Sequence, residues 1–445
     1  MANKLNILQV NTLDVGGGAA KIAWNLFQTY NQNKHASHLA VGHKSSNNPL
    51  VYEIPKYKNS WYKFWVACSK KTKPFIGKIK GAGRAHDLLL SIAQPQSVLS
   101  YIRSTENFNF SGTKRLLELC PIKPDILHAH NLHGDYFDLR LLPQFSTKIP
   151  TILTLHDAWM LGGHCAHSFQ CTKWKTGCND CPNLSIPLTL RQDSTKYNWM
   201  RKKEIYQKSK LYIATPCQWL MNKVNQSILS HGIIEKKVIH NGIDLSVFRP
   251  TESKNKIREK FHLAQDSFVL LFVGHLTKSN PWKDYKTLEK ALIELSKRQA
   301  KQKIIVLCLG QAAEPKKINN IEIKFIPYTN DDTIVAQYYQ LSDVYVHPAK
   351  AETFPNSILE ALACGLPVIA TNVGGIPEQI TQDTGILYKQ QNAADLSQKI
   401  ISLSQNKSIR KQMGVSARKD AEKRFDLEKQ TKQYLNWYQQ ILNQR

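Results

Sequence analysis

Short apolar runs alternate along the chain with longer segments in which apolar residues recur every three or four positions. A run of this kind is strand-sized, and the longer period is that of an amphipathic helix. Alternation of the two predicts parallel sheets with helices on both faces. Strands are predicted at 5–10, 125–129, 151–155, 211–214, 267–273, 304–310, 321–326, 344–347 and 367–370, and helices at 19–30, 285–297, 357–363 and 417–442.

The alternation of predicted strands and helices is interrupted at residues 240–250 and then resumes. The stretch 240–250 contains Asn241-Gly242 and ends at Pro250, which indicates turns rather than a strand or helix. A chain of 445 residues suits two domains. We therefore predict two Rossmann-like doubly wound α/β domains facing each other across a cleft, at 1–240 and 241–445, with the last helix crossing back to the first domain.

Composition narrows the class of protein. Hydrophobic residues make up 42% of the chain and charged residues 21%, which is typical of a globular protein. No apolar run is long enough to span a bilayer, and the first one is interrupted by Asn6 and Gln9, unlike a signal peptide. A cytoplasmic location is expected. The net charge of +26 favours polyanionic partners, such as anionic lipid, nucleic acid or phosphorylated substrates.

The segment 351–376 carries the most specific chemistry. Glu352 and Glu360 are separated by seven residues, and the second lies inside a predicted helix. The residues between them place backbone amides at a helix N-terminus, which suits a diphosphate. Carboxylates beside that site accept hydrogen bonds from sugar hydroxyls. The residues predicted to contribute to this site are Phe354, Pro355, Asn356, Ser357, Gly374 and Gly375.

Taken in order, these motifs resemble the retaining GT-B glycosyltransferases of family 4 (glycosyl transferases group 1). The pattern is Glu, seven residues, Glu, then Ala-x-Ala-x-Gly-x-Pro-Val and Gly-Gly. Three further segments fit the same family: Gly16-Gly17-Gly18-Ala19, Pro124–His130 and Val238–Asp244. The resemblance covers essentially the whole chain and implies transfer of a hexose-type sugar from a nucleotide-sugar to a glycan or lipid-linked saccharide, with retention of configuration.

The resemblance also assigns roles in a metal-independent reaction that requires no cofactor. Glu360 would hold the nucleotide ribose, Glu352 the donor sugar and Lys283 the diphosphate. The family's second diphosphate cation, an arginine, is absent, and His275 stands in its place; Lys278 is the alternative cation. By the same resemblance, attack comes from the donor's front face, with the leaving diphosphate as the base.

Histidines follow the predicted strands of the first half. The resemblance singles out His156 as the residue beside the reaction centre, where it would stabilise charge as the glycosidic bond loosens. His128, His130 and His133 are candidates for the acceptor side, with structural histidines as the alternative. Gly16, Gly17 and Gly18 allow the backbone to approach the donor closely, with a simple strand-to-helix turn as the alternative.

Four cysteines lie within seventeen residues, in an insert at about 160–185. Cys165, Cys171, Cys178 and Cys181 do not have the spacing of a double Cys-x-x-Cys site. Structural zinc, reduced thiols packing a loop, and disulfides remain open as alternatives. A similar insert occurs in a subset of family 4, so we expect this loop to border the acceptor site.

The segment Trp61–Arg84 interleaves aromatic residues with lysines. This composition suits an anionic membrane surface, because aromatic rings sit at headgroup depth and lysines meet anionic lipid. It predicts peripheral association with the inner face of the cytoplasmic membrane; a solvated loop over core aromatics is the alternative.

Three other functions compete with a transferase. A sugar-nucleotide epimerase or hydrolase would share the fold, and a degenerate chain would be a non-catalytic sugar-binding protein. The charge also fits a polyanion-binding protein, but the chain has no recognisable nucleic-acid motif, and no nucleic-acid partner is expected.

Overall fold

The computed structural model describes residues 4–56, 60–275, 280–299 and 302–444. The chain divides into two compact units. The first comprises residues 1–215, 221–237 and 440–445, and the second comprises 216–220 and 238–439. The main division between Lys237 and Val238 lies close to the predicted boundary, and the end of the last helix clusters with the first unit.

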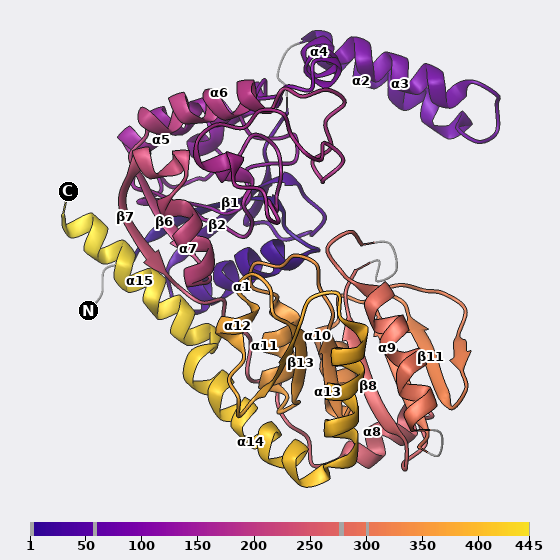
Figure 1. The fold of residues 1–445 in the computed structure, drawn as a ribbon. Helices are drawn as coiled ribbons and strands as arrows, with labels where there is room; N and C mark the ends of the chain where they lie inside the picture. The colour runs from indigo at the N-terminus through magenta and orange to yellow at the C-terminus, as the bar shows by residue number, and fades with distance from the viewer. Residues whose placement is uncertain (1–3, 57–59, 276–279, 300–301, 445) are drawn as a thin grey trace. The chain divides into compact units, whose positions relative to one another are not determined.

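The first unit contains a seven-stranded sheet in the order β3-β2-β1-β4-β5-β6-β7. Figure 1 labels β1, β2, β6 and β7 of this sheet. All pairings from β3 to β6 are parallel. The order reverses between β1 and β4, which is where doubly wound sheets bind ligands. The strands are β1 (Asn6–Leu13), β2 (Ala36–His43), β3 (Val51–Glu53), β4 (Ile126–Ala129), β5 (Thr151–Thr154), β6 (Leu211–Thr215) and β7 (Ile233–Val238), and the helices are α1 (Gly18–Gln32), α2 (Ser60–Thr72), α3 (Ala82–Ala93), α4 (Pro95–Ile102), α5 (Leu142–Lys148), α6 (Thr195–Gln207) and α7 (Gln218–Asn225).

The second unit repeats this plan in the order β10-β11-β9-β8-β12-β13-β14. Only the edge pair β10–β11 is antiparallel among the pairings of the described strands. The order reverses between β8 and β12. The strands are β8 (Phe268–Val273), β9 (Ile304–Leu309), β10 (Lys316–Ile318), β11 (Ile321–Ile326), β12 (Val344–His347), β13 (Val368–Thr371) and β14 (Gly385–Tyr388), and the helices are α8 (Lys254–Lys260), α9 (Tyr285–Arg298), α10 (Asp332–Leu341), α11 (Asn356–Ala363), α12 (Ile376–Gln379), α13 (Ala393–Gln405), α14 (Lys407–Arg424) and α15 (Leu427–Asn443).

The sequence pattern explains these elements directly. Strand β9 is buried along its whole length, as a central parallel strand covered on both faces must be. Helix α9 turns Leu288, Leu292 and Leu295, spaced at three and four residues, into the same core. The fold is therefore the predicted pair of doubly wound α/β domains.

Most of the segment Trp61–Arg84 lies in α2, a following 3-10 turn and the start of α3, so the alternative of a solvated loop is wrong. Helices α2 and α3 lie side by side as a hairpin that projects from the rest of the first unit (Figure 1). The Trp61 indole Nε1 donates to the Ile92 carbonyl at 2.8 Å and ties the two helices together. Large apolar side chains nevertheless remain exposed on the hairpin, among them Trp61, Phe64, Phe75, Ile79 and Leu88.

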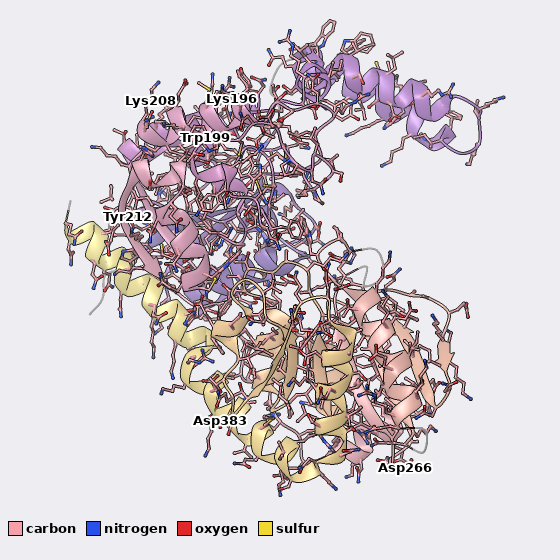
Figure 2. The ribbon with its side chains drawn as sticks, viewed as in Figure 1. Lys196, Trp199, Lys208, Tyr212, Asp266 and Asp383 are labelled. Atoms are coloured by element: carbon pink, nitrogen blue, oxygen red, sulfur yellow. The ribbon has the colours of Figure 1, made fainter. Side chains whose placement is uncertain are left out.

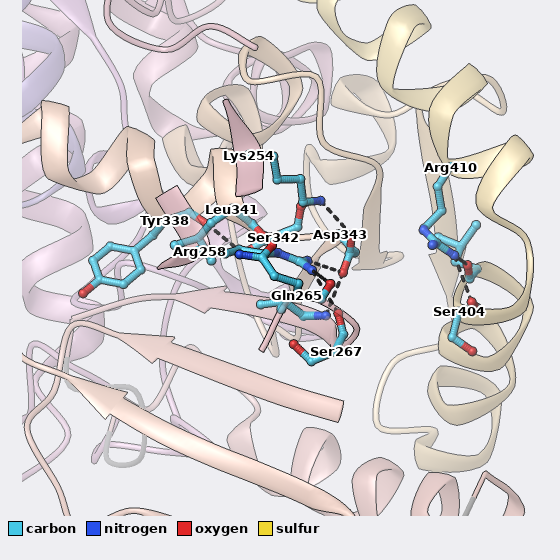
Figure 3. Close-up of polar contacts among 12 residues, drawn as sticks. Lys254, Arg258, Gln265, Ser267, Tyr338, Leu341, Ser342, Asp343, Ser404 and Arg410 are labelled. Carbon is cyan, nitrogen blue, oxygen red and sulfur yellow. Dashed lines mark hydrogen bonds and ion pairs between the residues drawn. The ribbon is translucent and has the colours of Figure 1, made fainter. Parts of the chain in front are cut away.

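A buried ion-pair network fastens the amino edge of the second sheet (Figure 3). Asp343, just before β12, lies 2.7 Å from both Lys254 Nζ and Arg258 Nη2 on α8. Its carboxylate also accepts the Val269 amide of β8 at 2.8 Å. Asp266 and Asp383, labelled in Figure 2, precede β8 and β14 and mark this same edge, opposite the one where a ligand is expected.

Candidate functional site

Two charged residues of the second unit, Lys283 and Glu352, meet near the carboxyl ends of β8 and β12. Strand β8 ends at Val273 and is followed by Gly274, and β12 ends at His347. A Cβ on Gly274 would lie 3.2 Å from the Lys283 Cε, so the missing side chain makes room for the lysine stem. Glu352 comes from the loop between β12 and α11. The topology therefore directs Lys283 and Glu352 to the point where the strand order reverses.

Lys283, Glu352 and His347 form one polar cluster. The Lys283 ammonium pairs with Glu352 Oε1 and lies 3.4 Å from His347 Nε2. His347 Nε2 is also 3.4 Å from Glu352 Oε1. Burial alone would raise the pKa of Glu352, but the Lys283 charge and His347 outweigh it, and the pKa is lowered. Glu352 is therefore an ionised carboxylate paired with the Lys283 ammonium.

His347 was not predicted from the sequence. It is fully buried, and burial followed by the neighbouring Lys283 charge lowers its pKa to about 4, so the ring is neutral. Its Nδ1 lies 2.8 Å from the Tyr345 hydroxyl. The available signal was its position as the last residue of a predicted strand, at the ligand edge of a doubly wound sheet.

Glu360 lies inside α11 and is buried. The Tyr339 hydroxyl of α10 donates to Glu360 Oε2 at 2.9 Å, a partner that the sequence did not suggest. Helix α11 begins at Asn356 without a side-chain cap, so its first amides point out of the helix end. Asn356 Oδ1 accepts from Asn241 Nδ2 at 3.1 Å, and the Ser357 hydroxyl lies 3.5 Å from His347 Nδ1.

Three residues predicted to contribute to the donor site make contacts within the protein. The Phe354 side chain is buried, stacked on His240 with ring centroids 5.3 Å apart, because the loop folds inward there. The Pro355 carbonyl accepts from Gln379. The Gly375 amide donates to the Thr353 carbonyl at 3.1 Å, so the interpretation of this amide as a ligand donor needs correction.

Gly374 has a structural reason to be glycine. Its φ is +61°, and a Cβ would lie 1.8 Å from the Glu352 carbonyl oxygen. The glycine turn therefore supports the backbone that presents Glu352. His275 is exposed at the end of β8, edge-on to Tyr328 at 5.4 Å, while Lys278 lies outside the described residues.

In the first unit, histidines gather at the carboxyl ends of β4 and β5. His128 Nε2 lies 2.7 Å from the Thr154 hydroxyl, and His130 Nδ1 lies 3.0 Å from His156 Nε2. Burial lowers the pKa of His128 to about 3 and that of His156 to about 4, with a contribution from neighbouring imidazoles. His128 and His130 are both buried, which favours their alternative as structural histidines.

His133 differs from the other histidines. Its Nε2 lies 2.9 Å from Asp157 Oδ2. Burial alone would lower the pKa of His133, but the Asp157 carboxylate outweighs it and raises that pKa. The pKa of Asp157 is lowered to about 2, since its bonds to His133 and the Trp159 amide overcome burial. The sequence did not single out Asp157, although it directly follows His156.

The glycine loop after β1 has the conformation that glycine favours. Gly16 and Gly17 have φ values of +93° and +79°, and a Cβ on either residue would meet nothing within 4 Å. Gly17 precedes helix α1, which starts at Gly18 without a side-chain cap. The loop therefore has open space beside it. It follows β1, which together with β4 forms the switch point of the first sheet.

Comparison with known proteins identifies the second unit. Residues 253–420 match the family described as "Glycosyl transferases group 1". The chain carries a glycosyl transferases group 1 domain. Solved structures share its GT-B fold. A glycosyltransferase from Rickettsia africae ESF-5 is 18% identical, with a TM-score of 0.61 over 99% of each chain, and Anabaena HepE in complex with UDP-glucose is 16% identical, with a TM-score of 0.62 over 99% of this chain and 100% of that chain.

Curated relatives agree with this class. The putative colanic acid biosynthesis glycosyl transferase WcaC of Escherichia coli K12 is 24% identical over 415 residues, covering 88% of this chain and 90% of WcaC. The D-inositol 3-phosphate glycosyltransferase of Streptomyces bingchenggensis is 30% identical over 202 residues, covering 42% of this chain and 44% of that protein. The chain is thus a glycosyltransferase by class.

The first unit of this glycosyltransferase contains a cavity of about 380 Å³. Beneath it, Lys202 is fully buried and pairs with Glu106 at 2.7 Å. The Lys202 ammonium also donates to the carbonyls of Trp159 and Gly162 at 2.8 and 3.0 Å. This clamp holds the loop after His156 in place. The cavity lining includes Tyr101, Glu106, His133, Asp135, Trp159 and Arg191.

The cysteine cluster lies beside this clamp. Burial raises the pKa of Cys165 to about 12 and that of Cys178 to about 11, so both are thiols. Cys178 Sγ accepts the Gly163 amide at 3.3 Å, and Cys181 Sγ lies 3.4 Å from His164 Nε2. All nine cysteines are free. Among the described ranges, no group of three or more His, Cys, Asp or Glu side chains is placed to hold a metal ion.

Among the helices of the described residues, none combines the length and the apolar character needed to cross a membrane. Asp331 caps helix α10, because its carboxylate accepts the amides of Thr333 and Ile334.

Proposed function

We propose that this glycosyltransferase transfers a hexose-type sugar from a nucleoside-diphosphate sugar to a saccharide acceptor, without a catalytic metal. The observation that carries the proposal is the meeting of Lys283, Glu352, Glu360 and the uncapped start of α11 at one switch point. A cation beside exposed amides suits a diphosphate, and two carboxylates suit the hydroxyls on either side of it.

Each of these groups binds a different part of the nucleotide-sugar donor. Glu360, held by Tyr339, accepts hydrogen bonds from the ribose hydroxyls. Lys283 leaves Glu352 and pairs with the diphosphate, stabilising the charge that develops as the leaving group departs. Glu352 is then free to orient the hexose. Retention by front-face attack, with the diphosphate taking the acceptor proton, follows the family resemblance.

The cavity of the first unit is the proposed acceptor subsite. It combines aromatic faces with charged and amide groups, the mixture that recognises sugar rings and their hydroxyls. Arg191 lies over the Tyr101 ring at 5.1 Å, so one wall is both flat and polar. A growing surface polysaccharide or a lipid-linked saccharide is the proposed acceptor, consistent with the name of WcaC.

The hairpin α2–α3 is the proposed membrane contact. No acidic residue occurs between 54 and 86, and Asp87 is the single carboxylate of the hairpin, so most of its exposed aromatic and aliphatic side chains lie among cations. The cations are Lys63, Lys70, Lys71, Lys73, Lys78, Lys80 and Arg84. Flotation with anionic vesicles at low salt should carry the protein upward, and neutral vesicles serve as the control. Absence of flotation with anionic vesicles would remove the membrane role.

A thermal-shift screen against UDP, GDP, ADP, CMP and their common sugar conjugates tests the donor site. A ligand at one hundred times its dissociation constant stabilises the folded state by about 2.7 kcal/mol. We expect one nucleotide class to raise the melting temperature and Glu360→Ala to weaken that shift. No shift with any nucleotide at millimolar concentration would refute the proposal.

A further inference from the structure

A chain of three polar side chains runs from β1 to the carboxyl ends of β4 and β5 in the first sheet. Gln9 lies on β1, His130 directly follows β4, and His156 lies two residues after the end of β5. His130 Nε2 is 3.1 Å from the Gln9 side-chain amide, and His130 Nδ1 is 3.0 Å from His156 Nε2. The rings of His130 and His156 are stacked, with an angle of 18° between their planes. Gln9 and His130 are both buried.

Two backbone groups fix the direction of the Gln9 amide. The side-chain atom that faces His130 also faces the Ala23 carbonyl at 3.3 Å, and the other atom faces the Phe27 amide at 3.0 Å. A carbonyl only accepts and an amide N–H only donates. The Gln9 nitrogen must therefore face Ala23 and His130, and its oxygen must face Phe27.

This direction determines where the protons of the two imidazoles lie. The Gln9 amide nitrogen only donates, so His130 Nε2 must accept. A neutral His130 then carries its proton on Nδ1 and donates it to His156 Nε2. A neutral His156 must in turn carry its own proton on Nδ1. Burial and neighbouring imidazoles hold the pKa of His130 well below its usual value, so neutral rings are the relevant form.

We propose that Gln9 and His130 are positioning residues that hold His156 as its Nδ1–H tautomer, so that His156 presents a hydrogen-bond donor to the substrate. A donor suits an oxygen that carries or gains negative charge, such as a sugar hydroxyl or the glycosidic oxygen as its bond loosens. His156 in this tautomer has no free ring nitrogen to accept a proton. The significance for transfer rests on the proposed function, whereas the tautomer itself does not.

Nitrogen NMR of the full chain, labelled with ¹⁵N in its histidines, tests the proposal without any substrate. Long-range proton–nitrogen correlations distinguish a protonated from an unprotonated ring nitrogen. His130→Asn and His156→Asn assign the signals. We expect wild-type His156 to be protonated on Nδ1 only, and Gln9→Met, which keeps the side-chain length but cannot donate, to give a mixture of both tautomers. Ser37→Ala, beside Gln9 but outside the chain of donors, should leave the tautomer unchanged.

Transfer assays add a functional readout. Gln9→Met should lower kcat while leaving the thermal shift by UDP unchanged, because the nucleotide site belongs to the second unit. A wild-type His156 protonated on Nε2, or an unchanged tautomer in Gln9→Met, would overturn the inference. A protein with the expected tautomer but no shift with any nucleotide would instead refute the proposed function alone.

Discussion

Substitutions of Lys283 and of Glu352 should have different effects on the affinity for a nucleoside diphosphate. In the ligand-free site they are partners, with side chains only 10% and 17% exposed. A diphosphate must take Lys283 from Glu352. A hydrogen bond to a charged group contributes about 1.5–3 kcal/mol. Lys283→Met should therefore weaken UDP binding about 10- to 150-fold. Glu352→Gln frees the lysine, so UDP should bind within about fivefold of wild type, or more tightly.

Isothermal titration of UDP into the wild type, both single variants and the double variant measures this difference. Denaturant unfolding is the control, because Lys283→Met leaves a buried carboxylate without its cation, and Glu352→Gln in the same chain should restore part of the lost stability. Transfer should fall in both single variants. If Glu352→Gln weakens UDP binding as much as Lys283→Met does, Glu352 contacts the nucleotide itself, and the assignment of Glu352 to the sugar is wrong.

Three further predictions concern residues that support the site. Lys202→Met should lower the free energy of unfolding by about 3–5 kcal/mol, because Glu106 loses its buried partner, and adding Glu106→Gln should recover part of it in urea denaturation. Gly374→Ala should destabilise by at least about 1–2 kcal/mol and displace Glu352, whereas Gly16→Ala, with open space at its Cβ, should cost less; melting and transfer assays compare them. Asp343→Asn should cost about 3–5 kcal/mol at pH 7 without changing UDP affinity. Lys254 and Arg258 outweigh burial and lower the pKa of Asp343. The carboxylate therefore contributes to the free energy of unfolding above about pH 4, and this contribution is lost as the pH falls below that value. A difference in the free energy of unfolding between Asp343→Asn and wild type that persists at low pH would contradict this.

Much of the fold was predictable because its signal is local. Each predicted strand has a counterpart, since continuous apolar runs such as 268–273 identify strands covered on both faces. Strand β2 was missed although it is buried. Its sequence contains Ser37, His38 and Gly42, and these residues interrupt the apolar run. The hairpin α2–α3 was missed for the opposite reason: its apolar residues remain exposed, so no buried stripe reveals the helical period.

The site was predictable only where a linear motif carries it. Glu352 and Glu360 belong to one such motif. Their partners His347 and Tyr339 come from β12 and α10, and only the folded sheet brings them to the carboxylates. Gln9 likewise lies inside a predicted strand, where a polar residue looks like an interruption. The motif gives the position of Phe354 but not the direction of its side chain, which is stacked on His240.

The two units use the same topological position with different electrostatics. At the switch point of the second unit, an ammonium and a carboxylate neutralise each other until a charged ligand separates them. At that of the first unit, burial keeps His128, His130 and His156 neutral. Under the proposed function, the charged pair of the second unit suits a charged diphosphate. The neutral imidazoles of the first unit offer weaker hydrogen bonds, which suit the uncharged hydroxyls of a sugar.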